Sequence, residues 1–76
     1  MPVFQVHITN NDYESGTDVE RDTREEVRND AILSAIQIGA DEISAGTPFF
    51  GAEVRIESEG EILERMVVAV GISQLR

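Results

Sequence analysis

The sequence predicts an α+β domain in which an antiparallel sheet of three to four strands packs against one long helix. Residues 3–9 and 52–57 alternate apolar and polar side chains, which is typical of half-buried strands. Residues 24–45 carry apolar side chains at helical spacing. Residues 61–72, which are almost entirely apolar from 66 onward, follow 52–57 across a glycine turn, and this indicates a hairpin. The resulting order, β-(β)-α-β-β, favours a two-layer architecture.

The chain has 76 residues, and we expect residues 1–76 to form a single domain. A chain of this length buries only about 60% of its unfolded surface, so a disulfide, a metal or a partner subunit usually adds stability. There is no cysteine, which excludes disulfides and thiol chemistry, and the lone His7 cannot form a histidine cluster. We therefore expect a homo-oligomer, either a dimer or larger.

The formal net charge is −9, from fifteen acidic residues against six arginines, with no lysine. This charge disfavours nucleic acids and anionic membranes as direct partners. It permits a basic protein partner, although a solvated acidic surface explains it as well. No apolar run approaches the roughly 20 residues of a membrane span. The first residues also lack a basic leader pattern, so we expect a cytoplasmic protein.

The first strand is clear and the second is not. In residues 3–9 one face is apolar (Phe4, Val6, Ile8) and the other carries Gln5, His7 and Thr9. The following Asn-Asn-Asp is turn chemistry. Residues 13–20 fit either a weak edge strand or a loop, because Gly16 and the acids weaken a strand.

The helix has well-defined ends. Thr23 and Glu26 have the spacing of a capping box, and Gly46 fits the position just after a helix C-terminus. Gly39 lies inside the helix and costs about 1 kcal/mol relative to Ala. We expect it to permit close approach of a strand or another helix.

The apolar arc of the helix covers more than half of its circumference. One face of a sheet usually covers a narrower stripe. We therefore expect either that the sheet wraps strongly around the helix or that a second subunit covers the remainder. The apolar positions are Val27, Ala31, Ile32, Ala35, Ile36, Ile38, Ala40, Ile43 and Ala45, with Leu33 at the border.

The last strand is apolar on both faces, which is typical of a central or interfacial strand. Alternation predicts that one face joins the helix-side core. Its members include Ile62, Met66, Val68, Val70 and Ile72. The opposite face is predicted to be an oligomer interface. It consists of Leu63, Arg65, Val67 and Ala69.

Two resemblances arise from these motifs. The stretch GADEISAGTPFFGAEVRIE, with the Gly60 turn and a Val-rich strand, resembles a family of small rhizobial and alphaproteobacterial proteins catalogued as a domain of unknown function. The opening VFQVHI is similar to theirs, and the chain departs from their pattern between 10 and 22. The resemblance implies a bacterial protein and no particular activity.

A strand, the helix opening TREEVRNDAI and the hairpin ending in VVAVGI are similar to dodecins, which are oligomeric flavin-storage proteins. Dodecins hold flavin with a Trp before the hairpin, and this chain has none. Phe49 and Phe50 are the nearest aromatics. They are interpreted either as plugs at the end of the core or as ligand or oligomer contacts. With Met66 they form the candidate ligand-binding set.

Little in the sequence supports catalysis. There is no GxSxG elbow, and without lysine there is no Walker A loop or Schiff base. Aligning Gly16 with position six of an EF-hand puts Tyr13 at a ligand position, so that motif fails. The carboxylates Asp22, Glu26 and Asp30 mainly repel one another. We predict no catalytic residues, no metal site and no cofactor.

The functional prediction is a non-catalytic oligomeric interaction or regulatory module. The alternative is a dodecin-like small-ligand protein of the flavin-binding type. An acidic decoy for a basic protein is a third hypothesis, which rests on charge alone.

Overall fold

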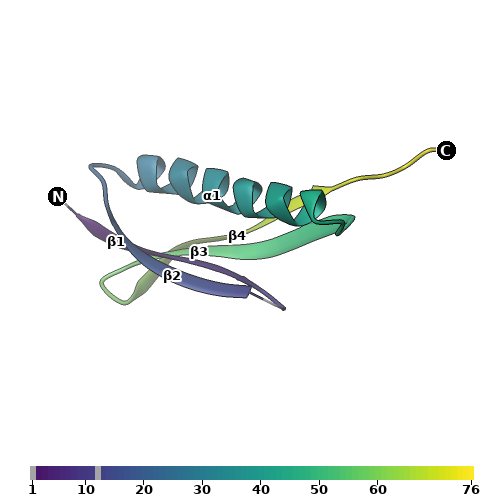
Figure 1. The fold of residues 1–76 in the computed structure, drawn as a ribbon. Helices are drawn as coiled ribbons and strands as arrows, with labels where there is room; N and C mark the ends of the chain where they lie inside the picture. Colours follow the sequence, from purple (N-terminus) through teal and green to yellow (C-terminus); the bar gives the residue numbers. More distant parts are fainter. Residues whose placement is uncertain (1, 12) are drawn as a thin grey trace.

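The computed structural model describes residues 2–11 and 13–76, and it confirms the α+β class. Four antiparallel strands form one sheet in the order β2-β1-β3-β4. One helix lies across one face of this sheet (Figure 1). The elements are β1 (Val3–Asn10), β2 (Tyr13–Glu20), α1 (Arg24–Ser44), β3 (Phe49–Ser58) and β4 (Glu61–Gly71).

Residues 13–20, for which the sequence left strand and loop open, form β2. Every residue of β2 pairs with β1, from Tyr13 opposite Asn10 to Glu20 opposite Val3. Only two residues separate β1 from β2, so closing this hairpin costs little chain entropy. Pairing with an amphipathic neighbour therefore outweighs the weak strand propensity around Gly16.

The core lies between the helix and the two central strands. The helix contributes small or branched side chains at four-residue spacing, which form one narrow stripe. Among the described residues, ten apolar side chains are buried: Phe4, Val6 and Ile8 from β1, Val27, Ala31 and Ala35 from α1, and Phe50, Ala52, Val54 and Ile56 from β3. Gly39 continues the stripe, and a Cβ there would lie 2.8 Å from Val70 Cγ2. The predicted close approach at Gly39 is confirmed.

The predicted helix ends are close to those observed. Thr23 Oγ1 accepts a hydrogen bond from the Glu26 N–H at 3.2 Å, and the Glu26 carboxylate accepts from the Thr23 hydroxyl. Ala45 is the C-cap, and Gly46 follows with φ +110°. A positive φ of this kind favours glycine, which explains why the helix stops there.

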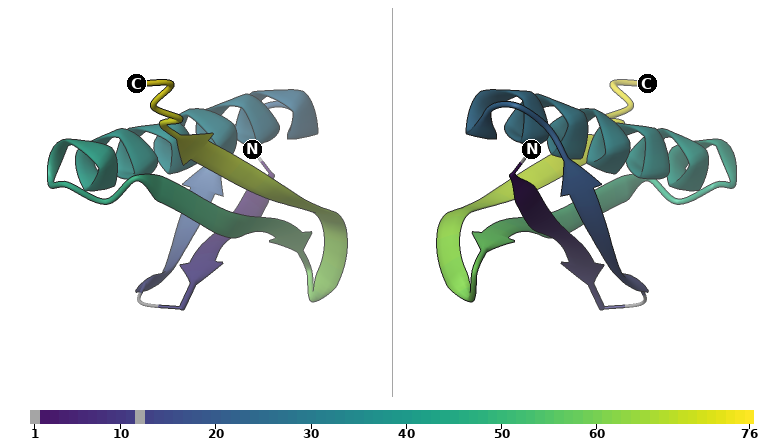
Figure 2. Two further views of the ribbon diagram at one scale, coloured as in Figure 1. Left: turned by 90° about the vertical axis from the view of Figure 1, so that its right-hand side faces the viewer. Right: turned by 90° about the vertical axis from the view of Figure 1, so that its left-hand side faces the viewer.

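The helix sits mainly over β3 and β4 and touches β1 only lightly (Figure 2). The sheet does not wrap around it. Leu33 and Ile36, on the wide apolar arc, are 64% and 42% exposed. Of the two expectations for this arc, wrapping by the sheet is therefore wrong.

A β-bulge in the second hairpin reverses the predicted faces of two residues. Ile56 lies opposite Glu64 but Glu57 lies opposite Ile62, so Leu63 is the extra residue. Leu63, predicted at the oligomer interface, packs against the core instead. Ile62, predicted in the core, is 51% exposed. A strict alternation cannot anticipate this reversal, since the bulge adds one residue to one strand.

Beyond the bulge the predicted alternation holds as far as Gly71. Met66, Val68 and Val70 are half-buried on the helix side, while Val67 and Ala69 are exposed on the other. Ile72, predicted in the core, lies past the end of β4 and is 63% exposed. The strand ends one residue too early for Ile72 to reach the core.

Candidate functional site

The outer edge of β4 offers unpaired backbone groups at alternate residues. The Ile72 N–H donates to the Pro48 C=O at 2.9 Å, across the pair Gly71 and Phe49. In an antiparallel ladder, residues whose backbone bonds to the neighbouring strand alternate with residues whose backbone points away from it. The Ile72 bond therefore shows that the even-numbered residues from 64 to 70 bond to β3. The N–H and C=O groups of Arg65, Val67 and Ala69 therefore point away from the sheet. Their side chains lie on the face opposite the helix.

The other edge of the sheet has the same geometry with different chemistry. The Arg21 N–H donates to the Pro2 C=O, so the outward-pointing residues of β2 are Glu14, Gly16, Asp18 and Glu20. Three of these four carry carboxylates. Charged side chains along an edge strand discourage pairing with another chain. The β2 edge is thus guarded by charge, while Arg65 is the one charge among the outward residues of β4 between 65 and 69.

Apolar side chains flank the β4 edge on both faces. Val67, on the helix-free face, is 75% exposed. Met66, Val68 and Val70 are half-buried on the helix side. Ile36 of α1 is also exposed, on the same half of the helix as Arg28, which contacts β4 through Glu64. We call these residues, with Ala69, the β4 edge surface.

Phe49 and Phe50 point to opposite faces of the sheet. Phe50 is a core residue with 4% exposure, which confirms the interpretation as a core plug for this ring. Phe49 is 62% exposed on the helix-free face. Its ring lies over two glycines, because a Cβ at Gly51 or at Gly71 would come within 3.2 Å of it. An aromatic ring over strand glycines shields backbone that would otherwise be bare.

The predicted ligand set does not come together within one chain. Phe49 and Phe50 are on opposite faces, and Met66 pairs with Val54 further along the sheet. A flat ligand could therefore contact all three only with help from another subunit. Phe49 and Phe50 separate because adjacent residues in a strand alternate faces, and a ligand site shared between subunits stays a prediction.

Arg65, a predicted interface residue, forms a two-pronged ion pair with Glu53. Its Nε and Nη2 donate to the two Glu53 oxygens at 3.3 and 3.1 Å. The hydrogen bond from Arg65 lowers the pKa of Glu53, against a smaller opposing effect of desolvation, and charge attraction from Arg65 and Arg55 lowers it further. The same bond raises the pKa of Arg65. The pair covers the exposed face where β3 meets β4.

On the helix side, Glu64 links the sheet to the first turns of the helix. Its carboxylate accepts from Arg24 Nε at 3.3 Å and from Arg28 Nε at 3.1 Å. Both arginines thus bond a carboxylate of their own chain, and Glu64 faces the helix because it has the same strand parity as Met66 and Val68.

His7 lies on the helix-free face, as predicted from its polar neighbours. Its Nε2 is 3.4 Å from Glu57 Oε2, and Arg55 Nε donates to the same oxygen at 2.6 Å. For His7 to act as a catalytic base, a nucleophilic side chain would have to lie within hydrogen-bond reach of it. The residue paired with His7 on β2 is Gly16, which has no side chain.

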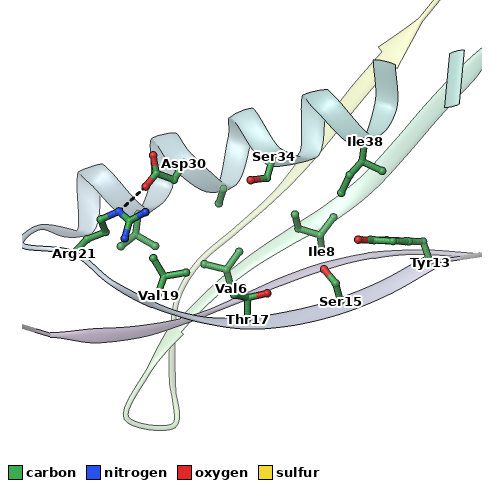
Figure 3. Close-up of a pocket in the computed structure, with 12 residues that line it drawn as sticks. Val6, Ile8, Tyr13, Ser15, Thr17, Val19, Arg21, Asp30, Ser34 and Ile38 are labelled. Atoms are coloured by element: carbon green, nitrogen blue, oxygen red, sulfur yellow. Dashed lines mark hydrogen bonds and ion pairs between the residues drawn. The ribbon is translucent and has the colours of Figure 1, made fainter. Parts of the chain in front are cut away.

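A groove of about 320 Å³ runs between the helix and β2, and we call it the α1–β2 groove. It forms because the helix sits over β3 and β4 and leaves the helix-side face of β2 uncovered. Figure 3 shows hydroxyls of β2 and of Ser34 directed into it, with the Arg21–Asp30 ion pair at one end. Its lining residues are Val6, Ile8, Tyr13, Ser15, Thr17, Val19, Arg21, Val27, Asp30, Ala31, Ser34 and Ile38.

Sequence reasoning missed this groove. The parity of Tyr13, Thr17 and Val19 was visible, and so was the polar stripe of the helix that contains Asp30 and Ser34. Their juxtaposition was not visible, because it depends on where the helix lies over the sheet.

Within residues 2–11 and 13–76, no three acidic or histidine side chains gather closely enough to hold a metal ion. In the same residues, no helix is both long and apolar enough to cross a membrane. The chain matches no family model, no curated protein and no solved structure. Both resemblances drawn from the sequence therefore stay predictions, and the fold rests on the structure alone.

Proposed function

We propose that the protein is a non-catalytic interaction module that self-associates through β4. The observation that carries this proposal is the outward-pointing backbone of Arg65, Val67 and Ala69 between two apolar flanks. Strand addition at such an edge satisfies the backbone groups and buries the flanking side chains together. Two four-stranded sheets would join into one continuous sheet.

A second copy of the chain is the partner that this edge fits best. A two-fold axis at Val67 pairs Val67 with itself and places Arg65 opposite Ala69 of the partner subunit, so no like charges meet. The same pairing at β2 would bring carboxylates together, which destabilises a ladder. The pairing also brings the exposed Ile36 of each subunit closer to the partner's sheet.

The overall dimensions support a partner as well. The radius of gyration is 13.6 Å, against about 11.4 Å expected for a compact domain of this length. Part of the difference comes from residues 72–76, which extend away from the sheet (Figure 1). A small domain with a thin core gains stability when a second copy covers its exposed apolar side chains.

Analytical ultracentrifugation of matched proline variants tests the proposal. Ala69→Pro removes an outward N–H of β4, and Asp18→Pro removes an outward N–H of β2 as the control. Proline at such edge positions spares the inner ladder. We expect the wild type and the Asp18 variant to be dimers or larger at low micromolar concentration. We expect the Ala69 variant to be a monomer with an unchanged circular dichroism spectrum.

Two results would contradict the proposal. One is a wild-type protein that stays monomeric across the concentration range. The other is an Ala69→Pro protein that is folded and keeps the wild-type mass. As a further check, Val67→Asp would bring two carboxylates together at the axis and should also yield a monomer.

A further inference from the structure

We propose that the α1–β2 groove binds a free α-amino acid with an apolar side chain. Arg21 would bind its carboxylate and Asp30 its ammonium group, with the side chain along the groove floor. This site is separate from the β4 edge surface, so the proposal does not depend on self-association.

The Arg21–Asp30 pair is the polar end of the site (Figure 3). Arg21 Nε donates to Asp30 Oδ2 at 2.7 Å, and Arg21 Nη1 donates to the Glu20 C=O at 2.7 Å. These two bonds fix the plane of the guanidinium, whose Nη2 carries two further N–H donors. The two side chains are 44% and 48% exposed, so a small molecule can reach both. Opposite charges side by side match the two charges of a zwitterion.

The charge of the whole protein favours a zwitterion over a simple anion. A net charge of −9 repels a free carboxylate such as a fatty acid. An amine without a carboxylate would be attracted to Asp30 but repelled by the positive charge of Arg21, whose Nε lies 2.7 Å from Asp30 Oδ2. An amino acid is neutral overall and offers each charged side chain an opposite charge.

The remainder of the groove suits a compact apolar side chain. Its floor contains Val6, Ile8 and Val19, and the side chain of Ile38 points into it from the helix. At about 320 Å³ the groove is at the small end of ligand pockets. A cavity of roughly 150 Å³ already accommodates benzene. A side chain of leucine or phenylalanine size therefore fits beside the polar end.

Titration of the 15N-labelled full chain with L-leucine and L-phenylalanine, followed by NMR, tests the proposal. We expect saturable shifts of the backbone amides of Thr17, Val19, Ser34 and Ile38 at millimolar ligand. 4-Methylpentanoate lacks only the ammonium group of leucine, and isoamylamine lacks only its carboxylate. We expect each to bind about tenfold more weakly, because one charged hydrogen-bond partner is lost.

Variants separate direct recognition from a structural effect. Arg21→Gln should weaken leucine binding about tenfold without weakening the binding of isoamylamine. Asp30→Asn should weaken leucine binding about tenfold without weakening the binding of 4-methylpentanoate. Arg24→Gln is the matched control. It removes a comparable exposed ion pair, with Glu64, outside the groove and should leave leucine binding unchanged.

Several outcomes would overturn the proposal. One is that neither amino acid shifts the groove amides, and another is that the shifts map to β4 instead. Binding of 4-methylpentanoate or isoamylamine as tight as that of leucine would remove the zwitterion argument. Groove amides that respond to protein concentration rather than to amino acid would show that a second copy occupies the groove.

Discussion

Gly39 of the helix lies directly over Val70 of β4, so closely that a Cβ on Gly39 would come within 2.8 Å of Val70 Cγ2. The same Cβ would lie 2.9 Å from the Phe50 ring. Contacts this short force neighbouring core atoms to move. The distance between the helix and the sheet is therefore set by the absence of a side chain at residue 39.

Gly39→Ala is expected to lower the free energy of unfolding by about 1–2 kcal/mol. Overpacking costs about 1–3 kcal/mol and outweighs the roughly 1 kcal/mol gained in helix propensity. Urea denaturation at one fixed protein concentration measures the change. Ala40→Gly changes an exposed residue next to Gly39 in the helix, so it measures the effect of helix propensity without the effect of overpacking. Adding Val70→Ala should recover part of the loss, and an increase in stability for Gly39→Ala would contradict the packing argument.

The turn between β3 and β4 places Glu59 at φ +53° and Gly60 at φ +78°. Two positive φ angles define a type I′ turn, which favours Asn-Gly. Glu59→Asn should therefore raise the free energy of unfolding by a few tenths of a kcal/mol, and Gly60→Ala should lower it by about 1 kcal/mol. Glu61→Asn, which changes the adjacent strand residue, is the control and should bring no gain. Thermal denaturation of the three variants at one concentration checks the order.

Cysteine cross-linking can locate the proposed two-fold axis, since the natural chain has no cysteine. In a hydrogen-bonded antiparallel pair the Cα atoms are about 5.5 Å apart, which a disulfide can span. We expect Val67→Cys to form a covalent dimer on mild oxidation and Ala69→Cys not to. Non-reducing electrophoresis distinguishes the two. A covalent dimer from the Ala69 variant alone would move the axis, and the absence of both would argue against pairing through β4.

The Glu53–Arg65 pair predicts a specific pH dependence. Its hydrogen bond holds the pKa of Glu53 below the ordinary value of 4.5. A lowered folded-state pKa contributes stability that is present above the unfolded pKa and is lost as pH falls through the folded one. A carboxyl-detected NMR titration should show Glu53 titrating below 4.5 and rising in Arg65→Gln. Arg55→Gln should shift the pKa less, and an unchanged titration in Arg65→Gln would rule out this cause.

Local patterns were sufficient to predict most of the fold. The capping residues Thr23 and Glu26 located the start of the helix, and Gly46 its end, because these signals act within a few residues of the backbone. Strand alternation correctly placed Phe4, Val6 and Ile8 in the core. Residues 13–20 were left open because their own propensity is weak, and their pairing with β1 decides their structure.

The candidate site was predictable only in part. Val67 and Ala69 were assigned to an exposed apolar face from alternation, and they lie there. Leu63 was wrongly included, since one bulge reverses the parity of all residues before it in β4. Phe49, Phe50 and Met66 were grouped by chemical type, yet they project from the sheet in different places.

By itself, the sequence determined the helix, its caps, every strand except residues 13–20 and many of the buried side chains, because these depend on spacing along the chain. Only the tertiary structure decided which edge of the sheet is guarded by acids and which is open, and where the helix leaves a groove. Those features depend on strand order, on the alternation of ladder hydrogen bonds and on the close contact at Gly39. Each is a relationship between residues that are distant in sequence.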